Sequence, residues 1–153
     1  MNNHSSRIPV TGHLAYRDEA IRFAIWALRL FRYEENTRIC NEIISSVLSG
    51  EPNRAWFEAR QLPGHRIRGK MEVYIRLLMT MTSECIQIDT ETLEFARWFA
   101  RVLPEEEHSD IRDEILTLLL NRQTDWVDFK LADLDCPVIR NKARGYLRAI
   151  TVS

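Results

Sequence analysis

Apolar side chains recur every three or four residues along most of the chain, which is the period of amphipathic α-helices. The first such stretch runs from His13 to about Tyr33. Apolar residues cover two of its faces, so we expect this helix to be central and packed on two sides. Residues 1–12 lack the period and are expected to form a flexible N-terminal lead-in.

Capping and chain-breaking residues divide the rest of the pattern into further helices. These are predicted at about 36–49, 52–62, 65–81 and 90–103, from about Ser109 to Leu120, around Trp126 and Phe129, and from Pro137 onwards. Residues 82–89 contain a short alternating stretch, for which a loop is favoured over a strand. The pattern therefore predicts an all-α fold, a single compact domain of seven to eight helices over residues 13–153.

Composition narrows the classes of protein that fit this pattern. The chain has 153 residues with five glycines and five prolines, which excludes collagen-like and turn-rich β-sandwich folds. Its apolar stretches, such as Ile115 to Leu120, are far shorter than the roughly 18 residues of a membrane span, so no membrane association is expected. Three cysteines without a Cys-x-x-Cys pair favour a reducing, cytoplasmic location, and no disulfide, metal or cofactor is expected.

Charge is nearly balanced overall but unevenly distributed. The net charge is −1, so no global field draws the chain to nucleic acid or to an anionic membrane. Residues 1–76 carry 12 Lys and Arg against 8 Asp and Glu, whereas residues 77–153 carry 9 against 14. The N-terminal half is therefore basic and the C-terminal half acidic.

A segment near the C-terminus resembles a known helical repeat. A short Asp-containing turn and Pro137 lead into Val138-Ile139-Arg140, and a helix rich in small residues continues to Ile150. This opening resembles the second helix of a HEAT repeat, most clearly over residues 133–150. The resemblance implies stacked helix pairs that serve as a binding scaffold, and an irregular helical bundle is the alternative.

Similar helix openings occur earlier in the chain, with Ile67 and Ile111 in the place of Ile139. The first two are 44 residues apart, inside the ~40–47 residues usual for such repeats. The last two are 28 residues apart, which is too short for a regular unit.

A basic stretch with interleaved aromatic residues is the first candidate binding surface. Six cations and only two acids lie between positions 54 and 76. The candidate residues are Arg54, Trp56, Arg60, His65, Arg66, Arg68 and Lys70. Such residues suit an acidic protein partner, and they also suit single-stranded nucleic acid. A third interpretation is that the arginines only cover solvated helix faces while Trp56 or Phe57 anchors the core.

Arg60 and His65 also fit the spacing Arg-x4-His, which resembles the RNase motif of HEPN domains. The resemblance implies that an Arg and a His from two protomers flank a scissile phosphate. The sequence departs from the family pattern at Gln61, where a more strongly polar residue is usual, and at Pro63-Gly64, which breaks the helix that would carry the motif.

An acidic cluster is the second candidate surface, suited to a basic partner. It consists of Glu105, Glu106, Glu107 and Asp110. Consecutive residues of a helix diverge around its axis, so this cluster is not expected to hold a metal ion. Carboxylates at a helix N-terminus also offset the helix dipole without any further role.

No catalytic signature is present, which favours a protein that is not an enzyme. The sequence predicts a small cytosolic protein–protein interaction module, such as an adaptor, subunit, inhibitor or immunity-type binder, that occludes or scaffolds its partner. A nucleic-acid-binding subunit using residues 54–76 is the alternative, and a HEPN-like RNase is the third hypothesis. Homo-oligomerisation stays open.

Overall fold

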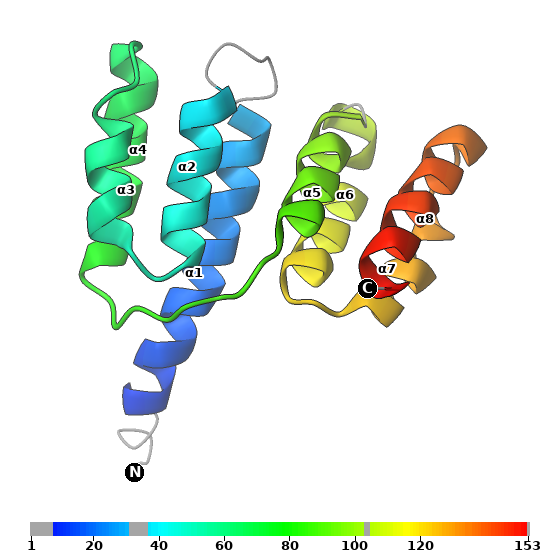
Figure 1. The fold of residues 1–153 in the computed structure, drawn as a ribbon, viewed down its shortest axis with the longest axis horizontal. Helices are drawn as coiled ribbons and strands as arrows, with labels where there is room; N and C mark the ends of the chain where they lie inside the picture. Colours follow the sequence, from blue (N-terminus) through cyan, green and yellow to red (C-terminus); the bar gives the residue numbers. More distant parts are fainter. Residues whose placement is uncertain (1–7, 31–36, 103–104, 153) are drawn as a thin grey trace. The chain divides into compact units, whose positions relative to one another are not determined.

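The computed structural model describes the backbone of residues 8–30, 37–102 and 105–152 and the side chains of residues 16–30, 38–102 and 110–151. These residues form eight α-helices and contain no strand, which confirms the all-α prediction (Figure 1). The helices are α1 (Ile8–Leu30), α2 (Thr37–Leu48), α3 (Pro52–Ala59), α4 (His65–Met79), α5 (Thr90–Val102), α6 (Glu105–Leu120), α7 (Thr124–Leu131) and α8 (Pro137–Val152).

Two helices begin earlier than the sequence pattern indicates. α1 begins at Ile8 instead of His13, because Pro9 falls in the first turn, where a missing N–H is tolerated. α6 begins at Glu105 instead of Ser109, because glutamates are good helix formers and suit an N-terminus. Residues 1–7 of the predicted lead-in lie outside the described residues.

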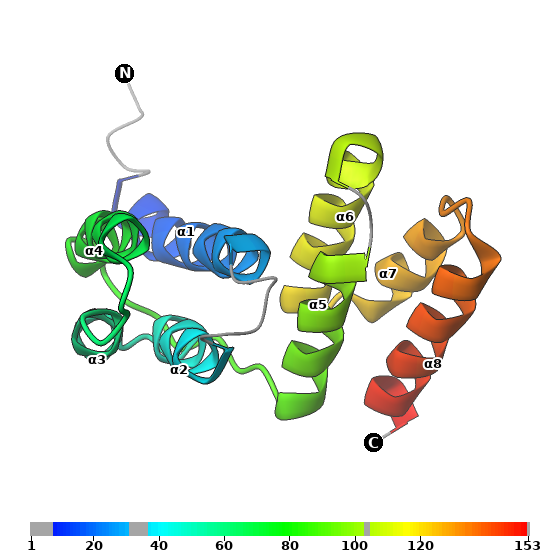
Figure 2. The ribbon, with the colours of Figure 1, turned by 90° about the horizontal axis from the view of Figure 1, so that it is seen from above.

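The helices belong to two compact units. Of the described residues, the first unit holds 8–27 and 37–87, and the second holds 28–30, 88–102 and 105–152. Figure 2 shows the first unit nearly end-on, with α4 beside both α1 and α3, and α2 beside α3. In the second unit, α5 packs against α6 and α8, and α7 packs against the same two helices. A single domain over residues 13–153 stays a prediction.

The core of the first unit contains one buried phenol that holds two helices together. Tyr16 is fully buried, and its hydroxyl donates a 2.6 Å hydrogen bond to the carbonyl oxygen of Val47. Burial raises the pKa of Tyr16 to about 12, so the hydroxyl keeps its proton at neutral pH. This bond ties α1 to the last turn of α2.

The same three types of aromatic ring form a cluster in each unit, which Phe99 joins in the second unit. The members are Phe23, Trp26 and Tyr74 in the first unit and Phe95, Trp98 and Tyr146 in the second. The centroid of Tyr74 lies 5.1 Å from that of Phe23, and the centroid of Tyr146 lies 5.2 Å from that of Phe95. Both phenylalanines are fully buried, so each cluster anchors the core of its unit.

Corresponding helices of the two units begin at a constant distance along the chain. α3 begins at Pro52 and α7 at Thr124, and α4 begins at His65 and α8 at Pro137, so both pairs are separated by the same number of positions. We call this separation the repeat offset. The turns before α3 and α7 are separated by the repeat offset as well, because Gly50 has φ 80° and its counterpart Arg122 has φ 63°.

The junctions between α3 and α4 and between α7 and α8 are held by the same contact. The Nη1 atom of Arg68 donates a 2.9 Å hydrogen bond to the Leu62 carbonyl, and Nη1 of Arg140 donates a 2.6 Å bond to the Leu134 carbonyl. Each arginine is the fourth residue of its helix and reaches back to the preceding junction. The guanidinium thus satisfies a carbonyl that the preceding helix leaves without a partner.

Asp89 caps α5. Its Oδ1 atom accepts a 3.0 Å hydrogen bond from the backbone N–H of Thr92. Hydrogen bonding from the side chain of Thr92, and then from its backbone N–H, holds the pKa of Asp89 below its ordinary value of 3.8, since both stabilise the ionised form.

We expect Asp89→Ala to lower the free energy of unfolding by about 1 kcal/mol, the usual cost of losing an N-cap. The pKa of Asp89 is lower in the folded state than in the unfolded state, so the charge of Asp89 stabilises the fold fully at a pH above the unfolded-state pKa. This stabilisation is lost as the pH falls through the folded-state pKa. Urea unfolding at neutral and acid pH measures both effects. Asp89→Asn is the control, since it keeps the capping oxygen without the charge. Equal stability of Asp89→Ala and wild type at neutral pH would contradict the prediction.

Candidate functional site

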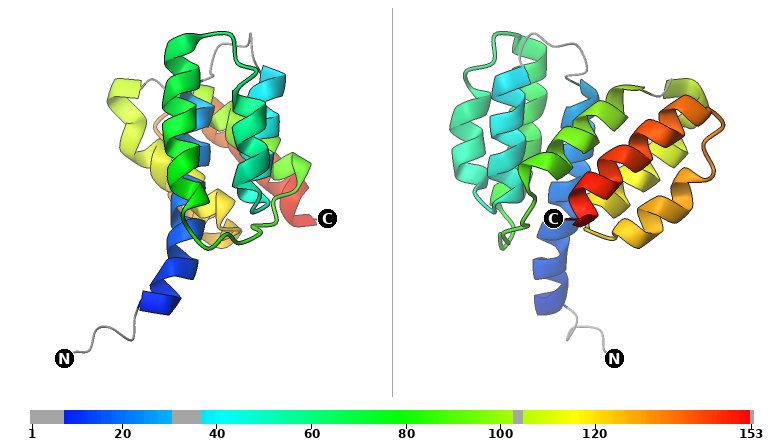
Figure 3. Two further views of the ribbon diagram at one scale, coloured as in Figure 1. Left: turned by 90° about the vertical axis from the view of Figure 1, so that its left-hand side faces the viewer. Right: turned by 45° about the vertical axis from the view of Figure 1, so that its right-hand side comes forward.

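The outer faces of α3 and α4 form the candidate surface, which faces the viewer in the left panel of Figure 3. Pro52 opens α3 at its first position, and Pro63-Gly64 separates α3 from α4. Ala55 and Ala59 of α3 are buried, as are Met71, Ile75 and Leu78 of α4. The remaining faces of both helices are therefore left to solvent. We call the exposed residues of α3, α4 and their junction the α3–α4 surface.

Most of the residues predicted from sequence lie on this surface. Arg60, His65, Arg66 and Lys70 are exposed, and Trp56 is half-buried. The guanidinium of Arg76 lies 4.9 Å from the ring centroid of Trp56. This cation–π contact covers one face of the indole and joins α3 to α4.

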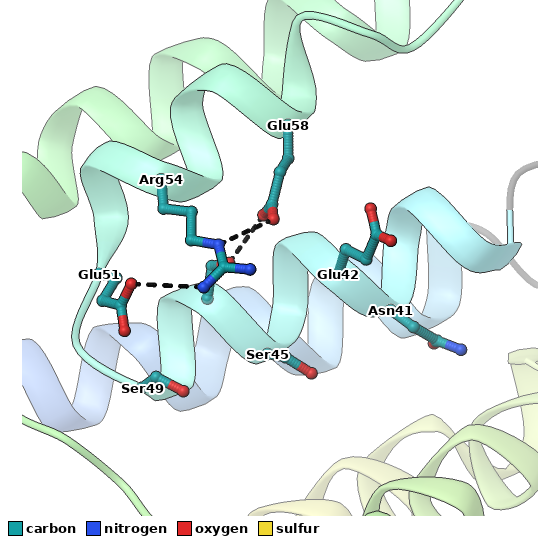
Figure 4. Close-up of a pocket in the computed structure, with 8 residues that line it drawn as sticks. Asn41, Glu42, Ser45, Ser49, Glu51, Arg54 and Glu58 are labelled. Carbon is teal, nitrogen blue, oxygen red and sulfur yellow. Dashed lines mark hydrogen bonds and ion pairs between the residues drawn. The ribbon is translucent and has the colours of Figure 1, made fainter.

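Arg54 differs from the other cations, because two glutamates neutralise it. Its Nη1 atom lies 3.7 Å from Glu51 Oε1, and its Nε atom lies 3.4 Å from Glu58 Oε2 (Figure 4). Glu58 also accepts a 2.7 Å hydrogen bond from the Ser46 hydroxyl of α2. These residues line a polar hollow of about 230 Å³ between α2 and α3. Arg54 therefore belongs to this hollow and not to the unpaired cations of the α3–α4 surface.

Arg68 has a structural contact in addition to its charge. It is half-buried, bonds the Leu62 carbonyl, and its Nη2 atom lies 2.8 Å from His65 Nδ1. Both contacts hold the turn between α3 and α4. Reversing its charge would therefore disturb the fold as well as the surface, unlike the exposed cations beside it.

The cations of the first unit divide sharply by their partners. Among its described residues, every arginine outside 60–76 lies within ion-pair distance of a carboxylate: Arg17, Arg22, Arg38 and Arg54. No carboxylate among the described residues lies that close to any cation of the α3–α4 segment: Arg60, Arg66, Arg68, Lys70 and Arg76. The positive charge of the first unit is thus left uncompensated at this surface.

Four exposed residues form one stripe along α4. Arg66, Lys70, Val73 and Leu77 follow one another at intervals of four, three and four residues, which places them on one helix face. Val73 is 70% exposed and Leu77 48% exposed. The neighbouring α3 adds Phe57, which is 65% exposed. The α3–α4 surface thus combines exposed apolar side chains with uncompensated cations.

Sequence reasoning missed the apolar part of this surface. Val73 and Leu77 lie opposite the buried stripe of Met71, Ile75 and Leu78, and this second apolar spacing was the available signal. Phe57 was considered a core anchor, but it is exposed. The adjacent Trp56 is half-buried against Arg76. Neighbouring residues of a helix point about 100° apart, so Trp56 can lie against Arg76 while Phe57 faces solvent.

The first turn of α4 carries charge of the sign that destabilises a helix start. It contains no acid, whereas His65, Arg66 and Arg68 lie within its first four residues. The partial positive charge of a helix N-terminus repels cations and favours carboxylates. Arg68 holds the turn before the helix, but stability of the helix does not account for the exposed Arg66.

The second candidate surface is only partly described. The side chains of Glu105, Glu106 and Glu107 lie outside the described residues, and Asp110 is exposed. Arg60 and His65 of the Arg-x4-His spacing lie on either side of the Pro63-Gly64 break, Arg60 just after α3 and His65 as the first residue of α4.

A metal site and a membrane-spanning helix are both absent from the described residues. The described residues hold no group of three His, Cys, Asp or Glu side chains arranged to bind a metal ion. None of the helices in the described ranges is both long and apolar enough to cross a bilayer. Comparison with family models, curated proteins and solved structures finds no match to this chain.

Proposed function

We propose that the chain is a protein–protein interaction module that binds an acidic partner through the α3–α4 surface. The observation that carries the proposal is the division of cations in the first unit. The arginines of that unit outside positions 60–76 have carboxylate partners, and the cations from Arg60 to Arg76 have none among the described residues. A partner that supplies carboxylates would complete these pairs and would raise the rate of association.

The apolar residues favour a protein partner over a nucleic acid. Phe57, Val73 and Leu77 are large and exposed, and they would form the apolar centre of an interface with a charged rim. A nucleic acid would instead require free aromatic faces for base stacking. One face of the Trp56 indole is already covered by Arg76, which leaves Phe57 as the exposed aromatic ring of the surface. The nucleic-acid alternative therefore becomes an outcome of the test below.

The proposal also includes the type of helical scaffold and the cellular location of the protein. A HEAT-like arrangement of helix pairs is supported by the matching arginine contacts of Arg68 and Arg140 at the start of α4 and α8. Rigid helix pairs would present the surface without ordering cost on binding. Action in the cytoplasm, by occluding or scaffolding the partner, completes the proposal.

The experiment compares four forms of the tagged full-length chain as baits in extract of its source cells. They are wild type, Arg66→Glu/Lys70→Glu, Val73→Asp/Leu77→Asp and the control Arg22→Glu/Arg38→Glu. The control makes the same charge change on exposed residues of α1 and α2. Proteins captured by wild type are identified, purified and titrated against each form.

We expect the two α4 variants to weaken binding of the same partner at least about tenfold, since both rim and centre of the interface are lost. The control should bind like wild type. Capture that survives nuclease treatment but not the α4 substitutions supports the proposal. Capture that nuclease abolishes, with a steep loss of affinity on adding salt, would favour the nucleic-acid alternative. Full affinity in both α4 variants would place the functional surface elsewhere.

A further inference from the structure

The second unit repeats the first at the repeat offset, and the repetition reaches individual contacts. Helix starts, left-handed turn residues and arginine contacts all correspond, as described above. The aromatic clusters correspond residue by residue, since Phe23, Trp26 and Tyr74 have Phe95, Trp98 and Tyr146 as their counterparts at that offset. The two units can therefore be compared position by position, including their surfaces.

One large exposed side chain is the same in both units. Phe57 of α3 and Phe129 of α7 are separated by the repeat offset and are 65% and 66% exposed. Buried counterparts are alike because the same core requires them. The core does not require a phenylalanine at an exposed position, where the side chain lowers solubility without adding stability. Its presence in both units indicates a surface that makes contacts with another molecule.

The charges around these two phenylalanines are opposite. Residues 52–66 contain three arginines and one glutamate, a balance of +2. The equivalent residues 124–138 contain one lysine and four aspartates, a balance of −3. The net charge of the two equivalent segments is thus opposite, although the arginines of the first segment do not have carboxylates at their own counterpart positions.

Two of the four acids around Phe129 are available to a partner, whereas Asp128 and Asp133 lie within ion-pair distance of Arg144 and Lys130. Asp125 and Asp135 are exposed, and neither lies within ion-pair distance of a cation among the described residues. Trp126 is 58% exposed, and its ring meets that of Phe129 edge-on with centroids 5.8 Å apart. This α7 surface, consisting of Asp125, Trp126, Phe129, Asp133 and Asp135, has an apolar centre and an acidic rim.

We propose that the α7 surface of one molecule docks on the α3–α4 surface of a second copy of this chain. The two surfaces are complementary, because each has an exposed aromatic centre and their rims have opposite charge. This inference rests on the proposed function of the α3–α4 surface and names one partner for it. The contact joins two different patches, so it is heterologous and either closes as a pair of contacts or extends into a chain of molecules.

The experiment is a charge swap followed by sedimentation velocity at low ionic strength. Variant one is Arg60→Glu/Arg66→Glu, and variant two is Asp133→Arg/Asp135→Arg. All four side chains are exposed, so circular dichroism should show both variants folded. The control is Arg22→Glu/Arg38→Glu, and each protein is measured alone from about 1 µM to about 1 mM, the range of weak transient contacts.

We expect wild type and control to sediment faster as concentration rises, and each variant alone to associate at least about tenfold more weakly. A mixture of the two variants should recover association, because the acidic α3–α4 surface of one meets the basic α7 surface of the other. The single substitution Phe129→Ala tests the contact without changing any charge. The Phe129→Ala protein should also associate more weakly than wild type.

Three results would overturn the inference: a wild-type chain that stays monomeric over the whole range, variants that associate as wild type does, or a mixture that recovers nothing. These results leave the proposed function intact if the α4 variants still lose the captured acidic partner. If every variant keeps both self-association and partner capture at wild-type strength, the two proposals fall together.

Discussion

A chain that ends at Asp135 should unfold with a free energy lower than that of the full chain by about 3–5 kcal/mol, because it lacks α8. Ala143 is fully buried and Leu147 is 6% exposed, and burial of one Leu side chain contributes about 1.5–3 kcal/mol. The ring of Tyr146 stacks on Phe95 at an interplanar angle of 5°, and such a pair adds about 0.5–1.5 kcal/mol. The Arg140 contact to the Leu134 carbonyl is lost as well.

Urea unfolding followed by circular dichroism measures this difference. A typical domain has only about 5–15 kcal/mol of stability, so the truncated chain should melt far earlier or fail to fold. Leu147→Ala in the full chain tests the same packing without removing the helix, with an expected loss of about 2–4 kcal/mol. An unchanged melting temperature in both proteins would show that α8 contributes nothing to the fold.

The second large effect is expected at the aromatic clusters. Phe95→Ala should lower the free energy of unfolding by about 3–5 kcal/mol, the usual cost of replacing a buried phenylalanine and leaving a cavity. Phe95 is fully buried and lies against Trp98, Phe99 and Tyr146. Phe23→Ala should have an effect of similar size in the first unit, because Phe23 is equally buried.

The chain contains its own matched controls for these substitutions. Phe57→Ala and Phe129→Ala remove the same side chain from exposed positions, where the expected change is within about 0.5 kcal/mol. Chemical denaturation of all four variants separates burial from residue type. Comparable losses at exposed and buried positions would contradict the assignment of the two cores.

Much of the fold was predictable because helix periodicity is local. Met71 and Leu78 are spaced as on one helix face and both are buried in α4, while Asp89 stands before an apolar helix as an N-cap does. The start of α1 was wrong, since Pro9 and Gly12 resemble chain breaks in sequence although a helix can accommodate them. Local patterns show where a helix is favoured, and packing against other helices extends it.

The pairing of side chains across helices was not predictable in the same way. The ion pair of Arg54 with Glu58 lies within α3, but the Ser46 hydroxyl that fixes Glu58 comes from α2. The similar openings at Ile67 and Ile111 suggested a different spacing, yet Ile111 lies in α6, which precedes the short helix α7, whereas Ile67 follows the short helix α3. The order of long and short helices and the matching arginine contacts show that α8, and not α6, is the counterpart of α4.

The turn that follows α2 and its counterpart after α6 differ in how much mutation they tolerate. Both require a left-handed residue, but a Cβ at Gly50 would lie 2.9 Å from the backbone of Glu84, and Ile86 N–H bonds the Leu48 carbonyl beside it. Position 50 is therefore closed to every other amino acid. Arg122 holds the same backbone shape at a cost of about 1–2 kcal/mol relative to glycine. A library that varies both turns should keep glycine at position 50 and accept many residues at position 122. The two turns therefore differ in how readily they accept substitutions, although their backbones are alike.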